Sequence, residues 1–332
     1  MPSASKSKPR EVNVLFTSAG RRVELLRAFQ RAYRSLRLKG KIIVTDIDRL
    51  APAFRVADST HLVPPYADPG YVPALLEIVR RERVRMVFPL IDPDIPILAA
   101  HKRKFESAGA VVMTPDADGA ETARDKWKTY EMYRRKGIPA ARSWLPEDLA
   151  GDRPEFPLFI KPRQGSAGIG AFRVADDRQL DFFLDYVEEP IVQECLPGPE
   201  ITCDVVCSAA GDVWAVVLRR RIEIRAGEVA KGVTLWDERI ARHCLAAAKG
   251  VNARGPITVQ CILKNGDPFF TEINARFGGG SPLGFAAGVD SPKWYLAEAD
   301  GRPETIPPLG SYTRGLYLTR FDDSFFFTEE ET

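Results

Sequence analysis

The chain has 332 residues, which is enough for two domains of ordinary size. Hydrophobic residues make up 45% and charged residues 28%, and this balance excludes a disordered chain. The 47 Lys and Arg against 45 Asp and Glu give a net charge of +2, without the basic excess of nucleic-acid-binding proteins. Five cysteines form no CxxC pair and three histidines lie far apart, so neither a disulfide framework nor a histidine-built metal site is expected.

The N-terminus and the hydropathy predict a cytoplasmic protein. Met1–Arg10 contains Ser, Lys and Pro without an apolar run, so it is expected to be a disordered tail and not a signal peptide. No stretch of eighteen apolar residues occurs, which predicts that no helix spans a membrane.

The first part of the chain alternates strands with helices. Short apolar runs predict four strands, and helical spacing predicts a helix after each of the first three. This order is typical of a parallel sheet in a Rossmann-like domain, here expected over residues 11–115. The expected strands are Val12–Phe16, Ile42–Val44, Val84–Phe88 and Ala110–Met113, and the expected helices are Arg21–Arg34, Tyr71–Arg81 and Ile95–Glu106.

The turn after the first strand contains a single glycine, Gly20. The GxGxxG fingerprint of dinucleotide-binding domains is therefore missing, which argues against an NAD-dependent oxidoreductase. A small anion at the start of the next helix stays open. Asp92 and Asp94, after the third strand, are interpreted as a cap of the following helix in preference to a part of a substrate site.

The second part begins with a charged helix, Asp116–Lys136, which Gly137 and Pro139 end. Strand candidates then dominate, which predicts an α+β domain with antiparallel strands over residues 116–320. The expected strands are Leu158–Lys161, Ala171–Val174, Ile191–Glu194, Ile201–Ser208, Val213–Arg225, Val259–Leu263 and Phe269–Asn274; helices are expected at Asp177–Tyr186 and Glu238–Ala248.

A lysine followed by a glycine-rich loop is the first candidate for chemistry. Lys161 ends a strand, and three glycines follow at 165, 168 and 170 before the next strand begins. Glycine lets backbone N–H groups approach phosphate oxygens, and a nearby lysine supplies positive charge. The spacing is not that of a Walker loop, and an exposed hairpin with a basic strand is an equal alternative.

Two further segments allow a functional and a structural interpretation. The link Gln193–Glu200 between two strands can offer backbone groups to an adenine edge, although an ordinary connection is the stronger interpretation. In Val213–Arg225, alternation places Arg219, Arg221 and Arg225 on one face. Such a face suits carboxylate or phosphate recognition, and a solvated sheet face is the alternative.

The hairpin Ile257–Arg276 is the most informative segment. Period two places Glu272 and Asn274 on one strand face, with Arg276 beside them if the chain stays extended. Carboxylate and amide oxygens are the ligands that Mg²⁺ accepts together with phosphates. A three-residue loop, Asn265–Asp267, would pair Gln260 with Glu272, Val259 with Ile273 and Cys261 with Thr271. We prefer it to a two-residue Asn-Gly turn because it gathers the polar residues on one face.

Taken in order, these segments resemble the ATP-grasp superfamily, and most of all its carbamoyl-phosphate-synthase large-chain-like branch. The resemblance covers about Val12 to Ser311 and implies a pre-ATP-grasp domain, a grasp domain and a small lid subdomain at about 127–190. It implies phosphate contacts from Lys126, Lys161, Gly165, Ser166 and Gly168; adenine and ribose contacts from Gln193, Glu194, Cys195, Leu196 and Glu200; metal ligands Gln260, Glu272 and Asn274; Arg276 at the transferred phosphoryl group; and Arg219, Arg221 or Lys231 at the substrate.

The resemblance implies an ATP-dependent ligase that joins a small-molecule carboxylate to an amine or similar nucleophile through an acyl phosphate, forming ADP and phosphate. The implied cofactors are ATP and two Mg²⁺ ions, with Mn²⁺ as a substitute. A kinase of the same fold and a non-catalytic nucleotide-binding protein are the alternatives. The single grasp unit and the missing glutaminase argue against carbamoyl phosphate synthesis by this chain. A homodimer is the default expectation, and the sequence does not name the substrates.

Overall fold

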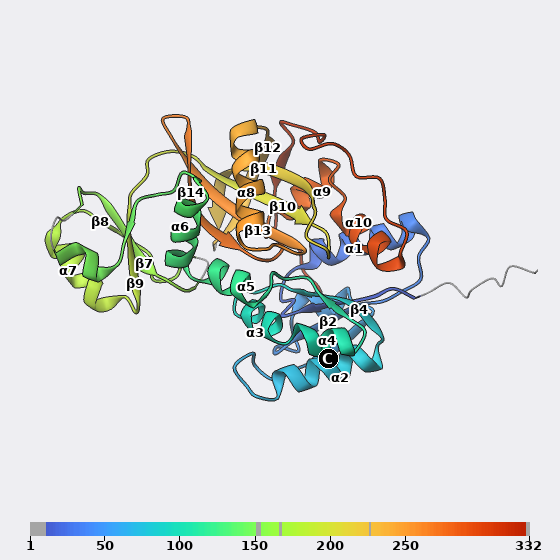
Figure 1. Cartoon of the computed structure of the whole chain (residues 1–332). Coiled ribbons are helices and arrows are strands. Elements are labelled where there is room, and N and C mark those ends of the chain that lie inside the picture. The colour runs from blue at the N-terminus through green and yellow to red at the C-terminus, as the bar shows by residue number, and fades with distance from the viewer. Residues whose placement is uncertain (1–10, 151–153, 166–167, 226, 330–332) are drawn as a thin grey trace, which may run out of the picture. The chain divides into compact units, whose positions relative to one another are not determined.

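The computed structural model describes residues 11–150, 154–165, 168–225 and 227–329, so the expected tail, Met1–Arg10, lies outside it. The chain divides into two compact units (Figure 1). The first contains residues up to 113 together with 289–307 and the C-terminal segment from 322; the second contains 114–288 and 308–321. The sequence prediction kept all of 116–320 in one domain, whereas residues 289–307 return to the first unit.

The first unit is built on a sheet of five parallel strands in the order β3-β2-β1-β4-β5. This confirms the predicted Rossmann-like sheet. The strand β3 was not predicted, because its Ser-Thr-His-Leu sequence has no apolar run. The strands are β1 (Asn13–Thr17), β2 (Ile42–Asp46), β3 (Ser59–Leu62), β4 (Val84–Pro89) and β5 (Val111–Val112). The helices are α1 (Val23–Leu36), η1 (Pro52–Arg55), α2 (Tyr71–Arg81), α3 (Asp94–Ala100), α4 (Lys102–Ser107) and α10 (Ser291–Asp300).

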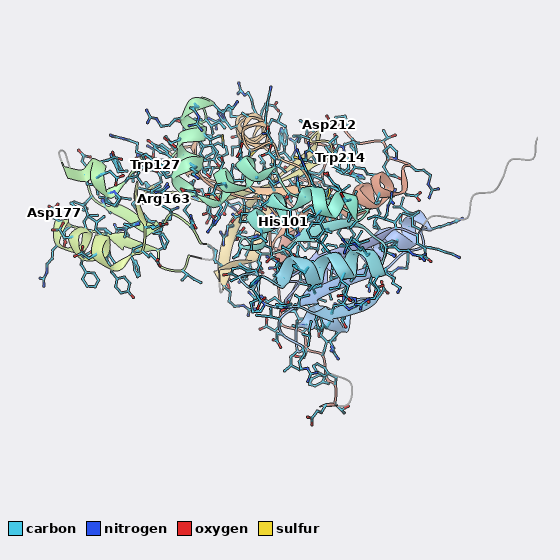
Figure 2. The ribbon with its side chains drawn as sticks, turned by 60° about the horizontal axis from the view of Figure 1, so that its bottom comes forward. His101, Trp127, Arg163, Asp177, Asp212 and Trp214 are labelled. Carbon is cyan, nitrogen blue, oxygen red and sulfur yellow. The ribbon has the colours of Figure 1, made fainter. Side chains whose placement is uncertain are left out.

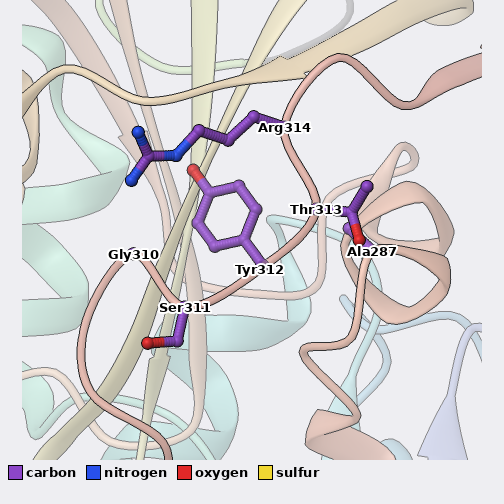
Figure 3. Close-up of a pocket in the computed structure, with 6 residues that line it drawn as sticks. All are labelled: Ala287, Gly310, Ser311, Tyr312, Thr313 and Arg314. Atoms are coloured by element: carbon purple, nitrogen blue, oxygen red, sulfur yellow. The ribbon is translucent and has the colours of Figure 1, made fainter.

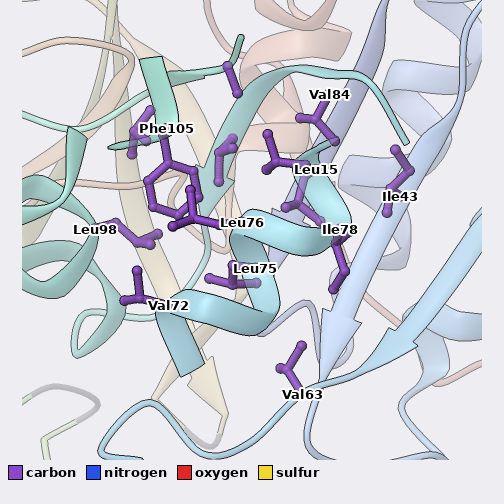
Figure 4. Packing of buried hydrophobic residues seen from close by; sticks show 14 of the residues in the cluster. Leu15, Ile43, Val63, Val72, Leu75, Leu76, Ile78, Val84, Leu98 and Phe105 are labelled. Carbon is purple, nitrogen blue, oxygen red and sulfur yellow. The ribbon is translucent and has the colours of Figure 1, made fainter. Parts of the chain in front are cut away.

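Two apolar clusters bury the faces of this sheet. Leu75 of α2 and Phe105 of α4 pack with Leu15 of β1 in one of them (Figure 4). In the other, Phe88 of β4 stacks on Phe16 and meets the edge of Tyr295 from α10. The predicted helix Ile95–Glu106 is wrong in one respect, because the backbone leaves the helical conformation at His101 and divides it into α3 and α4.

The second unit contains a six-stranded antiparallel sheet in the order β14-β13-β10-β11-β12-β15. Helix α8 packs against β10, β11 and β13, and α5 and α6 pack against β14. The strands are β10 (Glu200–Cys207), β11 (Val213–Arg225), β12 (Glu228–Leu235), β13 (Pro256–Lys264), β14 (Asp267–Asn274) and β15 (Tyr317–Thr319). The helices are α5 (Ala117–Arg124), α6 (Lys126–Arg135), α8 (Glu238–Gly250) and α9 (Ser281–Ala286).

A smaller antiparallel sheet of four strands lies within the second unit, in the order β6-β9-β7-β8. Its own apolar cluster joins Leu158 and Ile160 to Val192 and to Leu180 of α7. The elements are β6 (Ser143–Trp144), η2 (Pro146–Ala150), β7 (Leu158–Pro162), β8 (Phe172–Val174), α7 (Asp177–Tyr186) and β9 (Pro190–Glu194). We call these elements the small sheet; it begins at Ser143, later than the residue 127 expected for a lid.

The predicted helix Asp116–Lys136 is two helices, α5 and α6, which meet at Asp125. Asp125 has an extended backbone and caps α6 by accepting hydrogen bonds from the N–H groups of Trp127 and Lys128. Its carboxylate also pairs with Arg163 from the end of β7, which Figure 2 shows beside α6. The predicted helix is divided here because an N-cap residue has a non-helical backbone, and Asp125 takes that position at the start of α6.

We expect Asp125→Ala to destabilise the protein by about 2 kcal/mol, because it removes the cap and leaves Arg163 unpaired. Asp125→Asn retains a capping side chain and loses only the ion pair, so its cost should be smaller. Urea unfolding of both variants measures the difference. Wild-type stability of Asp125→Ala would contradict this account of the break.

The β13–β14 hairpin corrects one part of the predicted register. Gln260 faces Glu272 and Val259 faces Ile273, as predicted. The turn, however, has two residues, because Lys264 pairs with Asp267, and Asn265 and Gly266 both have positive φ as a type I′ turn requires. A bulge then places Cys261 opposite Phe270 instead of Thr271. The predicted three-residue loop is therefore wrong: the Asn-Gly turn that local conformation favours forms instead, and the bulge restores the polar face.

Candidate active site

The polar residues of the hairpin lie on one face of the six-stranded sheet. Glu272 is directly opposite Gln260, which is directly opposite Thr202, and Thr202 is opposite Arg219. Directly opposite residues of antiparallel strands share a face, so this row continues across four strands. Val259 points to the other face and is fully buried. We call the surface formed by Glu200, Gln260, Glu272 and Asn274 the polar face.

Hydrogen bonds join most of the polar face into one chain. Asn274 Nδ2 donates to Gln260 Oε1 at 3.1 Å, and Gln260 Nε2 donates to Glu200 Oε1. Glu200 also pairs with Arg221, whose Nη1 lies 2.7 Å from its carboxylate. Among the described residues, no hydrogen bond or ion pair engages the carboxylate of Glu272. This carboxylate and the amide oxygen of Asn274 are hard donors that a cation could use.

Two lysines reach the same region from other elements. Burial lowers the pKa of Lys161 to about 8, while the charges of Glu272 and Glu200 oppose that shift and the charge of Lys126 adds to it. The structure therefore brings Lys161, Lys126, Glu200 and Glu272 within electrostatic range of one another. A lysine with a lowered pKa beside carboxylates is typical of a functional site.

The glycine loop is anchored to α6. Lys126 is nearly buried, and its Nζ donates to the carbonyl oxygen of Gly165 at 2.8 Å. Gly165, Gly168 and Gly170 all have positive φ, with values of 116°, 72° and 70°. These angles require glycine, and they leave the loop backbone free of Cβ atoms. Ser166, predicted as a phosphate contact, lies outside the described residues.

The predicted hinge has side chains that stabilise the small sheet. Gln193 is buried and donates to the Ser143 hydroxyl at 2.8 Å. Glu194 accepts from the N–H of Arg142 and lies 3.5 Å from Lys264 Nζ. The N–H groups of Glu194 and Cys195 already donate to the carbonyl oxygens of Arg142 and Pro157, so an adenine contact with this main chain would use its carbonyl oxygens or the N–H of Leu196.

The predicted substrate arginines differ in environment. Arg219 is 2% exposed and forms a bidentate pair with Asp204, at 2.6 and 2.8 Å, so it is not presented to a ligand. The alternation of β11 placed it correctly but could not reveal the acid on β10. Arg221 forms an ion pair with Glu200. Lys231 forms another on an exposed part of the sheet, where its Nζ lies 2.6 Å from the carboxylate of Glu223.

Arg276 follows the end of β14 and does not continue the strand. Its backbone N–H donates to the carbonyl oxygen of Asn274, which turns the chain, and its Nη1 donates to the carbonyl oxygen of Phe277. The condition under which Arg276 would share the face of Glu272 is therefore not met. The sequence analysis missed the close packing that follows this turn: a Cβ on Gly280 would lie 2.1 Å from Arg219 Nη1. The run of three glycines was the signal for such close packing.

A second polar cluster lies in the first unit, at the carboxyl ends of β1 and β4. Asp94 is fully buried and accepts from the hydroxyls of Thr17 and Ser18 at 2.7 and 2.8 Å. Burial raises the pKa of this carboxyl. The interpretation of Asp94 as a helix cap is wrong, because no side chain caps α3. Asp94 instead holds the first βα turn, in which Ser18 has a positive φ.

An open pocket of about 590 Å³ lies beside the loop at 310–314 (Figure 3). Tyr312 lines the pocket, and two hydrogen bonds hold its hydroxyl group. The hydroxyl donates to the carbonyl oxygen of Leu235 and accepts from the N–H of Leu218. Arg314 lies over the ring of Trp236 at 6.0 Å. The pocket was not predicted, because its residues are spread over a loop without a motif.

In the part of the chain that the structure describes, no helix combines the length and the apolarity needed to cross a membrane. The same residues contain no group of three or more His, Cys, Asp or Glu side chains arranged to bind a metal by themselves.

Comparisons with known proteins identify two domains in the chain. A family model described as "PylC-like, N-terminal domain" matches residues 14–113, and one described as "ATP-grasp in the biosynthetic pathway with Ter operon" matches residues 187–318. The phosphoribosylamine–glycine ligase of Chlorobaculum tepidum is 26% identical over 62% of this chain and 56% of the relative. The 3-methyl-D-ornithine–L-lysine ligase of Methanosarcina acetivorans is 27% identical over 80% of this chain and 69% of the relative.

The fold agrees as well. The structure of N5-carboxyaminoimidazole synthetase from Staphylococcus aureus, complexed with ADP, aligns with a TM-score of 0.72 at 14% identity, over 92% of this chain and 82% of that one. The chain spans little more than half the length of the glycine ligase. The predicted superfamily is confirmed over these two parts of the chain: residues 14–113 form a PylC-like N-terminal domain, and residues 187–318 belong to an ATP-grasp domain.

Proposed function

We propose that the chain is an ATP-dependent ligase that joins a carboxylate to an amine and forms ADP and phosphate. The observation that supports this best is the convergence of Lys161, Lys126, Glu200 and Glu272 in one electrostatic environment. Two lysines suit the phosphates of a nucleotide, and an acid beside them suits its ribose hydroxyls or its metal.

The two lysines, the segment after β9 and the polar face would have separate roles. Lys126 and Lys161 would bind phosphate oxygens, and the main chain at Glu194–Leu196 would contact adenine. Glu272 and Asn274 Oδ1 fit Mg²⁺, since both are hard oxygen donors on one strand face. Mg²⁺, when bound, would neutralise phosphate charge and strengthen the electrophilic character of the γ-phosphorus. Two ions, and Mn²⁺ as a substitute, belong to this proposal.

The proposed reaction has two steps, phosphoryl transfer to the carboxylate and attack of the amine on the acyl phosphate. A carboxylate oxygen bonds to the γ-phosphorus while the bond from that phosphorus to the β-bridging oxygen breaks, which releases ADP. The amine nitrogen then bonds to the acyl carbon, the carbon–oxygen bond to phosphate breaks, and a proton leaves the nitrogen to solvent. Fixed cations at the phosphates stabilise the charge that develops on the transferred group.

The test is ADP formation with pairs of small carboxylates and amines. Amino acids come first in both roles, since the two relatives are named as ligases of glycine and of L-lysine. A ligase forms ADP only when both substrates are present, and hydroxylamine replaces the amine by trapping an acyl phosphate as a hydroxamate. A kinase instead yields a stable phosphorylated hydroxyl compound, which ³¹P NMR detects. Nucleotide binding without ADP from any pair would support the non-catalytic alternative.

The lowered pKa of Lys161 predicts a pH dependence of nucleotide binding. Phosphate favours the charged lysine, so below pH 8 the free protein already carries the proton, and above pH 8 binding must take one up. We expect affinity for Mg²⁺–ATP to fall about fivefold between pH 8 and 9, because the charged fraction of Lys161 in the free protein falls by that factor. Calorimetry in buffers of different ionisation enthalpy measures the proton uptake.

Lys161→Arg is the matched control, because arginine stays charged across this range. Its affinity should change little between pH 8 and 9, and its binding should take up no proton. If the wild type and Lys161→Arg lose affinity in parallel, another group is responsible for the pH dependence.

We also propose that the chain assembles as a homodimer. Light scattering of the purified protein measures its mass in solution and tests this proposal.

A further inference from the structure

The C-terminal segment (residues 322–329) lies against the first unit through two aromatic side chains. The guanidinium carbon of Arg55, in η1, lies 4.3 Å from the centre of the Phe327 ring. That of Arg27, in α1, lies 5.9 Å from the centre of the Phe325 ring. A guanidinium over an aromatic ring within about 6 Å is attracted by the negative face of the ring. These two cation–π contacts therefore dock the segment on α1 and η1.

Exposure alternates along the docked segment. Phe325 is 36% exposed, Phe326 is 94% exposed, and Phe327 is again partly buried. A period of two is typical of an extended chain, in which every second side chain points the same way. In the part of the chain that the structure describes, this segment adds no strand to the parallel sheet of the first unit. It can therefore detach without breaking a sheet.

The surface that receives the segment is continuous and basic. The side-chain amide of Gln30, in α1, donates to the carbonyl oxygen of Val56, directly after η1, at 2.8 Å, which joins the two elements. Three arginines spaced three or four residues apart share one exposed face of α1. They are Arg27, Arg31 and Arg34. None of them forms an ion pair with any residue that the structure describes.

The segment complements this surface in charge. Residues 322–332 contain five acidic residues and no Lys or Arg. A guanidinium binds aromatic rings by stacking on their faces and binds carboxylates by ion pairing. The segment therefore presents both kinds of group to the arginines of α1 and η1.

We propose that α1 and η1 form a docking surface for a partner protein that presents an acidic segment with aromatic residues at alternate positions. The C-terminal segment of this chain has that pattern, so it occupies the surface until a partner displaces it. A nucleic acid, which also combines negative charge with aromatic groups, is less well matched, because the chain as a whole has a net charge of only +2. The inference goes beyond the ligase proposal and does not depend on turnover.

The probe for this surface is a fluorescein-labelled peptide with the sequence of residues 321–332, whose anisotropy measures binding to the full chain. In the wild type, the C-terminal segment competes with the peptide at a high effective concentration. Replacing both docked rings, with Phe325→Ser and Phe327→Ser in one chain, removes this competition. We expect this double variant to bind the peptide about tenfold more tightly than the wild type.

Phe326→Ser in the full chain is the matched control, because it removes an exposed ring and leaves both docked rings in place. It should bind the peptide as weakly as the wild type. Within the double variant, Arg55→Gln and Arg27→Gln should each weaken peptide binding about threefold, and a thermal melt checks that both remain folded. Arg80→Gln removes the same charge from an exposed position on α2 and should leave peptide binding unchanged.

Equal binding of the peptide by the wild type and the double variant would overturn the inference, because the C-terminal segment would then not occupy the surface. Equal weakening by Arg80→Gln and Arg27→Gln would also overturn it, since the attraction would then be one of net charge. If the double variant binds an oligothymidylate of the same charge more tightly than the peptide, the surface belongs to a nucleic acid and not to a protein segment.

Discussion

Glu272→Gln is expected to reduce ADP formation by at least a hundredfold while changing the melting temperature little. The substitution keeps the size of the side chain and removes one negative charge from a carboxylate that forms no hydrogen bond or ion pair with the described residues. The loss should arise from weaker binding of Mg²⁺–ATP, since the carboxylate both neutralises the metal and fixes it. ADP formation at several Mg²⁺ concentrations and a thermal melt measure the two effects.

Val259→Thr is the control for this variant. Val259 lies one residue from Gln260, on the opposite face, and is fully buried. A hydroxyl without a partner there should cost about 1–3 kcal/mol of stability and leave nucleotide affinity nearly unchanged. If Glu272→Gln retains near-wild-type activity at low Mg²⁺, the polar face is not the metal site.

Gly280→Ala is expected to be among the most destabilising single changes, at about 2–4 kcal/mol. The backbone of Gly280, with φ −92°, suits alanine, so the effect is purely steric. The new Cβ would lie 2.1 Å from Nη1 and 2.8 Å from Cζ of Arg219. Arg219 cannot withdraw without leaving the buried Asp204 unpaired. A fall in melting temperature and in the midpoint of urea unfolding should both be observed.

Gly284→Ala provides the comparison, four residues further along the chain in α9. Its Cβ would meet Val217 at 3.4 Å or more, which is ordinary contact, and alanine is the better helix former. This variant should be neutral or slightly more stable than the wild type. Equal melting of Gly280→Ala and the wild type would mean that Arg219 has room to shift.

Hydrophobic patterns in the sequence predicted the parallel sheet, the antiparallel hairpins and the polar face. Strands and amphipathic helices repeat with different periods, so the segments Tyr71–Arg81 and Val213–Arg225 could be delimited from their own residues. The opposition of Gln260 and Glu272 was predicted for a similar reason, since a sheet with one buried face tolerates few registers. The predicted roles of these residues in binding ATP and metal stay predictions.

Only the tertiary structure decided which polar groups meet across the sheets. The pattern of β11 showed that Arg219 and Arg221 share a face, but the acids that pair with them stand on β10, 15 and 21 residues away. Asp125 likewise breaks a helix where Arg163 meets it, 38 residues later. The hydrophobic periodicity of a sequence indicates on which face of a helix or strand a residue lies, because burial acts on each side chain separately. A hydrogen bond or an ion pair depends on two positions at once, and the folded chain alone brings these together.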